Sequence, residues 1–272
     1  MKVVVGYDGS LSANGAIRTA GALFPGAEAV IVYLSTPPFG SKGLRARLRH
    51  SARNVDELID LVDRESEGES ARLVDIGVTL ARAAGWTPQP LVKRTWAGEG
   101  LGLAQVGEEL QPEVMVVGAR GIGASESKIG SVSDLVVHHS PRPVLVVSQH
   151  MLSAEHEAVA DGPVVVGVDG SAGSDRASKA AAQLFPNRTV VTAAVSDGDA
   201  DDVDAMHHVR RFRGSGAGCT ADALVAFADE QRAATLVVGS RGRSGLKKVL
   251  LGSVAGATLQ RTFRPVLVVP GG

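Results

Sequence analysis

Residues 3–10 read VVVGYDGS, and residues 164–171 read VVVGVDGS, 161 positions later in the chain. The same distance separates the tripeptides Leu23-Phe24-Pro25 and Leu184-Phe185-Pro186. Such a repeat indicates the domain organisation before any helix or strand is predicted, because each copy must form the same structural unit. The 272 residues therefore contain two copies of one domain of ordinary size.

The second half of the unit recurs at a shorter distance. Residues 116–118 return as residues 237–239, at a distance of 121 positions, and residues 130–147 return as residues 252–269, at a distance of 122. The second copy is therefore 40 residues shorter in its middle. It is also one residue longer between the two glycine-containing blocks.

The segment between the copies, Gln149 to Gly162, has no apolar period and contains three acidic residues, which is typical of a linker. We expect a first domain over residues 1–150, a linker over residues 151–162 and a second domain over residues 163–272.

Short runs of β-branched residues, such as Val3-Val4-Val5, suit strands of a parallel sheet that helices cover on both faces. Serine-containing turns precede helix-like stretches at Asn14 to Leu23 and at Asp175 to Leu184. The first copy then continues with a strand over residues 29–34, a helix over 54–84, a strand over 89–93, a helix over 101–110 and a strand over 114–117. This alternation predicts an α/β fold of two tandem doubly wound, Rossmann-like domains.

The contraction of the second copy falls on the long helix of the first. After a strand over residues 190–195, the second copy passes through an aspartate-rich segment to a candidate strand over residues 209–213. Its second helix is expected to shrink to a loop or one turn. One sheet face of the second domain would then be less covered, unless another subunit or leucines of the first copy pack there. Those leucines are Leu48, Leu58 and Leu61.

The second copy carries a glycine loop with the spacing Gly239-x2-Gly242-x9-Gly252-Ser253. Glycine lets the backbone approach an oxygen anion closely, and the N-terminus of the helix that follows presents free N–H groups to it. Asp169 lies at the carboxyl end of the first strand of this copy, where open α/β sheets bind ligands. A carboxylate there can accept hydrogen bonds from ribose hydroxyls, so the pattern indicates a nucleotide site.

Several features have a plain structural reading beside the functional one. The glycines could serve tight turns alone, and Arg120 and Arg241 could be solvated loop residues rather than phosphate ligands. Trp86 and Trp96 are expected to pack beside the third strand of the first copy. The arginines between residues 45 and 53 are interpreted as a solvated connection into the long helix.

The composition excludes several classes of protein. A net charge of -1 gives no general attraction to nucleic acid or to anionic lipid, and no stretch is apolar enough to span a membrane. The start of the chain lacks the apolar length of a signal peptide, so we expect a soluble cytoplasmic protein. The only cysteine, Cys219, excludes an internal disulfide. No catalytic arrangement of serine, histidine and carboxylate can be placed at the glycine loop.

The repeated motifs carry a family resemblance. The opening Val-x-Gly-x-Asp-Gly-Ser, the Gly-x2-Gly-x9-Gly-Ser loop and the closing Arg-Pro-Val-Leu-Val-Val strand resemble those of tandem universal stress proteins over nearly the whole chain. The resemblance implies a mainly parallel five-stranded sheet of order 3-2-1-4-5 in each copy. It also implies that the closing strands, residues 144–147 and 266–269, pair across a pseudo-twofold axis.

For members that have this loop, the resemblance implies ATP binding, and Asp8 or Asp169 could help to hold Mg²⁺ beside the phosphates. Carried over to the second copy, the ATP contacts fall on Val168, Asp169, Val195, Gly239, Arg241, Gly242, Gly252, Ser253 and Val254. In the first copy they fall on Asp8, Leu34, Gly118, Arg120, Gly121, Gly130, Ser131 and Val132. Only eight residues separate Gly121 from Gly130, so the first loop has a shorter reach and the first site is expected to be weaker.

The leading hypothesis is an ATP-binding sensor or regulator of the stress response, whose partners are an adenine nucleotide and, as an option, a second copy of the chain. The alternatives are a slow ATPase, an adenylate-forming enzyme or an interaction protein that binds no nucleotide.

Overall fold

The computed structural model describes residues 1–36, 42–119, 129–196, 206–210, 216–240 and 251–271. In the first repeat these residues form β1 (Lys2–Gly6), α1 (Leu11–Leu23), β2 (Glu28–Ser35), α2 (Lys42–Arg49), α3 (Val55–Ala83), β3 (Thr87–Arg94), α4 (Glu99–Leu110), β4 (Val114–Gly118), α5 (Ser131–His139) and β5 (Val144–Val147). After α6 (Ser153–Asp161), the second repeat forms β6 (Val164–Val168), α7 (Ala172–Leu184), β7 (Val190–Ser196), β8 (Met206–Arg210), α8 (Ala217–Glu230), β9 (Thr235–Gly239), α9 (Ser253–Arg261) and β10 (Val266–Val269).

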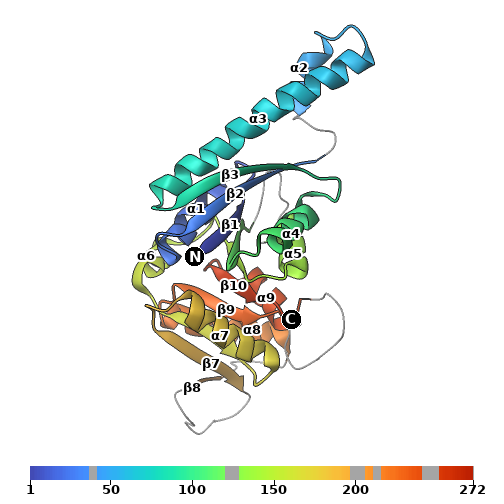
Figure 1. Cartoon of the computed structure of the whole chain (residues 1–272). Coiled ribbons are helices and arrows are strands. Elements are labelled where there is room, and N and C mark those ends of the chain that lie inside the picture. Colours follow the sequence, from blue (N-terminus) through green and yellow to red (C-terminus); the bar gives the residue numbers. More distant parts are fainter. Residues whose placement is uncertain (37–41, 120–128, 197–205, 211–215, 241–250, 272) are drawn as a thin grey trace.

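The strands of the described residues form one sheet in the order β3-β2-β1-β4-β5-β10-β9-β6-β7-β8 (Figure 1). Within each repeat the pairs are parallel, and their order is 3-2-1-4-5 in both copies. The predicted tandem Rossmann-like architecture is confirmed. Because β5 and β10 pair antiparallel, the carboxyl ends of the parallel strands point to opposite edges of the sheet in the two repeats.

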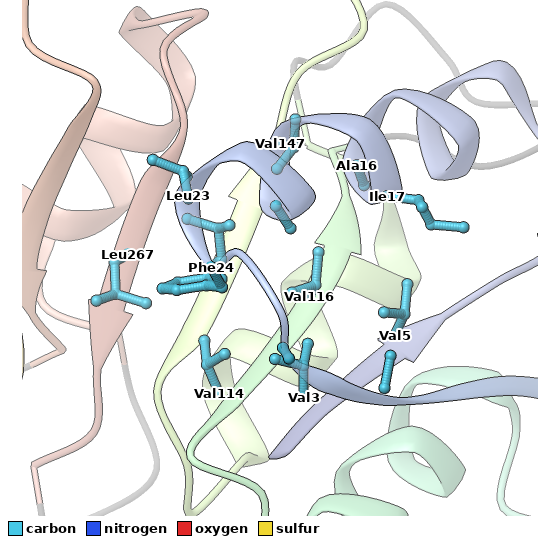
Figure 2. Packing of buried hydrophobic residues seen from close by; sticks show 14 of the residues in the cluster. Val3, Val5, Ala16, Ile17, Leu23, Phe24, Val114, Val116, Val147 and Leu267 are labelled. Carbon is cyan, nitrogen blue, oxygen red and sulfur yellow. The ribbon is translucent and has the colours of Figure 1, made fainter. Parts of the chain in front are cut away.

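A pseudo-twofold axis passes between the repeats. Leu145 of β5 lies opposite Leu267 of β10, and these two leucines occupy equivalent positions in the two copies. Phe24 and Phe185 are equivalent too, and their rings stack with centroids 5.2 Å apart. Figure 2 shows Leu23 and Phe24 beside Leu267 of the other repeat. Contact between equivalent residues is the mark of an isologous interface, so one chain has the symmetry of a dimer.

Alternation along the central strands sends side chains into two apolar layers. Val3 and Val5 of β1 belong to the layer that contains residues of α1, α3, α6 and α7, whereas Val4 belongs to the layer that contains residues of α4, α5, α8 and α9. Each layer includes buried residues of both repeats. The chain therefore has a continuous core across the axis, in which Figure 2 shows the packing of α1 on β1 and β4.

The segment expected as a linker contains helix α6, residues 153–161, which packs against α1. Leu152 N donates to the side chain of Glu155, and Val159 faces the core. The guanidinium of Arg188 donates to the carbonyls of Val159, Ala160 and Gly162 near the C-terminus of α6. Tertiary contacts of this kind stabilise a short helix that lacks a strong apolar period.

The long helix of the first repeat is confirmed almost to the residue. Asn54 is its N-cap and accepts a hydrogen bond from Glu57 N at 2.8 Å, and Ala84 is its C-cap. The arginine-rich segment before it was expected to be a solvated connection, but residues 42–49 form α2, which packs on α3. Both helices extend past the edge of the sheet in Figure 1.

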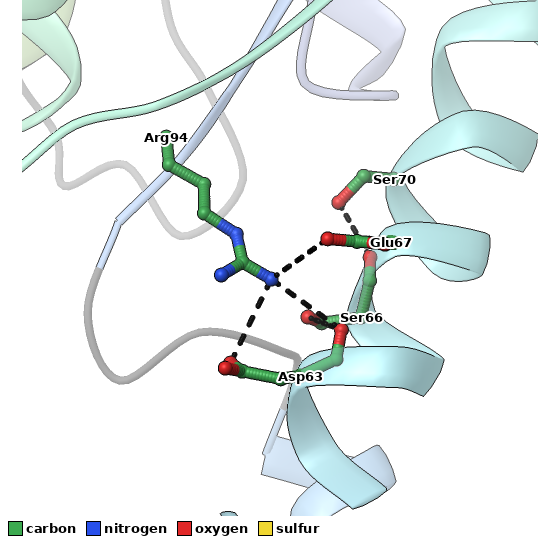
Figure 3. A network of polar contacts seen from close by, with 5 residues as sticks. All are labelled: Asp63, Ser66, Glu67, Ser70 and Arg94. Atoms are coloured by element: carbon green, nitrogen blue, oxygen red, sulfur yellow. Dashed lines mark hydrogen bonds and ion pairs between the residues drawn. The ribbon is translucent and has the colours of Figure 1, made fainter. Parts of the chain in front are cut away.

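An ion-pair network ties the edge strand β3 to α3. Arg94 lies 3.3 Å from Glu67 and 3.6 Å from Asp63, and it also donates to the main-chain oxygen of Asp63 (Figure 3). All three side chains are partly exposed to solvent, so the network contributes modestly to stability.

The second repeat has adapted to the loss of its long helix. In the first repeat α3 packs on β2 and β3, and α2 packs on α3, so the hypothesis that Leu48, Leu58 or Leu61 covers β7 is wrong. On β7, Thr192 stands where β2 has Ile31, and Ala194 stands where β2 has Tyr33. Smaller or more polar side chains on the less covered face reduce the cost of its exposure. The strand that follows is β8, Met206–Arg210, which begins three residues before the expected range.

The two tryptophans behave differently. Trp86 is buried and its indole N–H donates to Phe24 O at 2.7 Å, as expected for a packing residue. Trp96 is 80% exposed, so its predicted packing role is wrong.

The arginine of the closing motif, just before the last strand of each repeat, forms hydrogen bonds with the segment that precedes the fourth strand. Arg264 is 5% exposed and donates to Asp229 at 2.7 Å and to Ala233 O at 2.5 Å. Its equivalent, Arg142, is half-buried and donates to Pro112 O and to the side chain of Gln111. We expect Arg264→Ala to lower the free energy of unfolding by about 2 kcal/mol, because it leaves the buried Ala233 carbonyl unsatisfied.

Arg142→Ala is the matched control and should cost less, about 1 kcal/mol, since Arg142 is itself only half-buried and its second partner, the Gln111 side chain, is exposed. Urea unfolding of the two variants measures the difference. An equal loss in both would contradict the role of burial at Arg264.

Candidate functional site

The Asp-Gly-Ser motif builds the same turn at the end of the first strand of each repeat. Ser10 N donates to Asp8 at 2.9 Å, and the Ser10 hydroxyl caps α1 by accepting from Ala13 N. In the second repeat Ser171 N donates to Asp169 at 3.0 Å, and the Ser171 hydroxyl accepts from Ser174 N. The glycine between them takes a positive φ, 78° at Gly9 and 72° at Gly170. The motif therefore fixes the aspartate at the carboxyl edge of the sheet.

A pocket of about 270 Å³ lies at this edge of the second repeat, near the lower end of the range for small-molecule sites. We call it the domain-2 pocket. It is lined by Gly167, Val168, Asp169, Ser174, Val195, Thr220, Leu224, Val238, Gly239, Gly252, Ser253, Val254 and Ala255. Seven of these residues were predicted as ATP contacts from the sequence: Val168, Asp169, Val195, Gly239, Gly252, Ser253 and Val254. The remaining two, Arg241 and Gly242, lie outside the described residues.

The lining of the pocket combines groups of different chemistry. Val195 and Leu224 offer apolar side chains, whereas Ser253 and Val254 stand in the first turn of helix α9, whose main-chain N–H groups have no partner within the helix. Asp169 supplies a carboxylate. A flat apolar group, a hydroxylated group and an anion can therefore be bound in one pocket.

The glycine loop is closed at its base by the same hydrogen bond in both repeats. Gly252 N donates to Ser240 O at 2.6 Å, and Gly130 N donates to Ala119 O at 2.6 Å. The one-residue difference in loop length therefore falls between these closing pairs, mostly outside the described residues.

The first repeat brings its predicted residues to the equivalent edge. Asp8 follows β1, Leu34 lies near the end of β2, Gly118 ends β4, and Gly130, Ser131 and Val132 form the start of α5. Arg120 and Gly121 lie outside the described residues. The Ser133 hydroxyl donates to Gly118 O at 2.5 Å, a contact that Ala255 cannot make in the second repeat.

The first-repeat site is more acidic than the domain-2 pocket. Partial burial and, to a smaller extent, the Asp8 carboxylate raise the pKa of Glu99 above its usual range. The pKa of Tyr33 is also raised, by burial first and then by Glu69, Glu99 and Asp8. These shifts place several carboxylates within electrostatic reach of one another at this site.

Sequence reasoning missed six of the lining residues, which are Gly167, Ser174, Thr220, Leu224, Val238 and Ala255. Thr220 and Leu224 come from α8, a helix without a motif, and only the alignment of the two repeats could have pointed to their positions. Among the described residues, no group of three His, Cys, Asp or Glu side chains could hold a metal ion, and no helix could cross a membrane.

A doubly wound sheet with a pocket at the carboxyl ends of its parallel strands defines a Rossmann-like α/β protein. The model of the universal stress protein family matches residues 1–148 and 205–270. The chain belongs to this family.

Individual relatives agree with this assignment. A universal stress protein of Mycolicibacterium smegmatis is 28% identical over 185 residues, which are 58% of this chain and 61% of that protein. The universal stress protein Rv2005c of Mycobacterium tuberculosis is 30% identical over 184 residues, 58% of this chain and 62% of that protein. The matches thus span less than two thirds of either relative. A solved universal stress protein from Archaeoglobus fulgidus is similar in fold over 100% of this chain and 98% of its own, with 21% identity and a TM-score of 0.69.

Proposed function

We propose that the second repeat binds ATP in the domain-2 pocket and that the protein acts as a nucleotide-dependent sensor or regulator. The observation that supports this most is that seven residues, which the resemblance to universal stress proteins implies as ATP contacts, line one pocket. They come from β6, β7, β9 and the start of α9, which are far apart in the sequence.

The chemistry of the lining fits an adenine nucleotide. Val195 and Leu224 suit the apolar faces of the base, and the Asp169 carboxylate suits the ribose hydroxyls. Ser253 and Val254, in the first turn of α9, suit phosphate oxygens through main-chain N–H groups and the Ser253 hydroxyl. Mg²⁺, where it accompanies ATP, would neutralise phosphate charge beside Asp169.

Binding would stabilise helices and strands of the second repeat that also contact β10, the strand at the pseudo-twofold axis. The pocket is lined by β9 and by the first turn of α7, while α7 packs on β10, the strand at the axis. A ligand that binds only the folded arrangement stabilises it in proportion to its concentration. A nucleotide could in this way change the surface that a partner protein recognises.

Asp169→Asn tests the proposal. Asparagine can still accept the hydrogen bond from Ser171 N, so the turn is kept, but the negative acceptor for ribose hydroxyls is lost. We expect ATP affinity to fall about 10- to 100-fold, the effect of removing hydrogen bonds to a charged group. Isothermal titration calorimetry measures it.

Asp175→Asn is the matched control. Asp175 is an exposed carboxylate in the first turn of α7, the helix that follows the Asp169 turn, and it lies outside the pocket lining. This variant should bind ATP like the parent protein. Absence of any heat with the parent protein would overturn the proposal, and steady release of ADP or AMP would replace the sensor with an enzyme.

A further inference from the structure

Helices α4 and α8 dock on their sheets in the same register. Leu103 of α4 packs over Gly6 of β1, and Leu224 of α8 packs over the equivalent glycine of β6, Gly167. Just after the helices, Gln111 and Arg232 both take a left-handed conformation, with φ of 47° and 48°. The two leucines, and likewise Gln111 and Arg232, are 121 residues apart, and the two glycines are 161 residues apart. These are the distances between equivalent positions of the two repeats.

This register places Glu99 of the first repeat at the position of Thr220 in the second. Thr220 lines the domain-2 pocket together with Asp169, and its hydroxyl donates to Gly216 O at 3.2 Å within its own helix. Glu99 lies in the first turn of α4 and keeps contact with solvent. The aspartate equivalent to Asp169 is Asp8, so each site pairs its ribose-side carboxylate with a different neighbour.

We propose that this position sets the preference of each site for ligand charge: Thr220 admits a nucleotide polyphosphate, whereas Glu99 directs the first site toward adenine ligands with little or no phosphate charge. The inference rests on the proposed function, because it assumes that both sites are built for an adenine nucleotide. Under this proposal Glu99 determines ligand specificity in the first repeat, and its effect does not depend on the length of the glycine loop.

The physical reason is repulsion between like charges at a partly desolvated site. Partial burial and, to a smaller extent, the Asp8 carboxylate raise the pKa of Glu99, so Glu99 and the ribose-side aspartate lie within electrostatic reach. The Glu99 carboxylate would act on phosphate groups bound nearby, and the repulsion grows with each added phosphate. Adenosine carries no phosphate and escapes it.

The test uses the whole chain and a series of ligands: adenosine, AMP, ADP and ATP. Thr220→Glu introduces the carboxylate of the first repeat into the domain-2 pocket, and Thr220→Gln introduces the same bulk without charge. Calorimetry at mildly alkaline pH, where a carboxyl with a raised pKa is ionised, should show a loss of ATP affinity in T220E about tenfold larger than the loss of adenosine affinity. In T220Q the two losses should be equal.

The reciprocal arm uses the first repeat. In a chain whose domain-2 pocket is weakened by Asp169→Asn, Glu99→Gln should raise ATP affinity at the remaining site by about tenfold and leave adenosine affinity unchanged. Because an acidic residue in a first helical turn also stabilises the helix, thermal unfolding of E99Q is recorded beside binding.

The outcomes separate the two proposals. If the parent protein binds adenine nucleotides but T220E and T220Q lose affinity equally for all four ligands, the charge preference is overturned and the proposed function stands. If the parent protein binds none of the four ligands, the proposed function fails and this inference fails with it.

Discussion

Truncation of Phe185 to alanine is expected to lower the free energy of unfolding by about 3–5 kcal/mol. The ring is buried to 2% exposure at the pseudo-twofold axis, where it stacks on Phe24, which is equally buried. Phe24 also provides the carbonyl that accepts the hydrogen bond of the Trp86 indole. Removal of Phe185 therefore leaves a cavity between the two repeats, in a core to which both contribute.

The stacked pair should be coupled as well as buried. In a double-mutant cycle of Phe185→Ala and Phe24→Ala, we expect a coupling free energy of about 0.5–1.5 kcal/mol, the value of an aromatic pair beyond its burial. Phe227→Ala is the control, because Phe227 is buried in the layer on the opposite side of the sheet and should show no coupling to Phe24. Urea unfolding followed by tryptophan fluorescence and by circular dichroism gives the values, and coincident transitions justify a two-state treatment. Additive losses would show that the rings do not hold the repeats together.

The architecture could be predicted from the sequence because its signals are local and repeated. Val3-Val4-Val5 and its copy mark central strands, and Asn54 marks the first residue before α3. Helix α6 was missed because few of its residues face the core and much of its support comes from Arg188, a residue far along the chain. The exposure of Trp96 could not be predicted either. Trp96 follows the end of β3, and the residue type alone does not show whether a side chain there points to the core or to solvent.

The site could be predicted only where a motif fixes the backbone. Asp169 stands in a turn that glycine and serine fix, Gly239 ends β9 and Ser253 begins α9, and the structure brings the three residues to one pocket. Thr220 carries no such mark, because a threonine in a first helical turn usually serves the helix alone. Its place in the pocket depends on the packing of α8 against β6, which the sequence of α8 by itself does not show.

Replacement of Gly239 by alanine is expected to abolish nucleotide binding at the domain-2 pocket. A Cβ at this position would lie 2.7 Å from Gly173 O and 2.8 Å from the carbonyl carbon of Gly173. Both atoms belong to the main chain of the first turn of α7, so no side-chain rotation can relieve the collision. The strand β9 and the helix α7 must move apart, and this displaces two walls of the pocket at once. Overpacking of this kind also costs about 1–3 kcal/mol of stability.

Gly15→Ala separates the collision from a general effect of substituting glycine. Gly15 is buried in α1, and a Cβ there would meet nothing within 4 Å. That variant should therefore gain about 0.4–1 kcal/mol of stability, because alanine loses less conformational entropy on folding. Calorimetry with ATP should show parent-like binding for G15A and no binding for G239A. Retention of ATP affinity in a destabilised G239A would mean that the close approach of α7 to β9 serves packing alone, and the pocket would then owe its function to Asp169 and the start of α9.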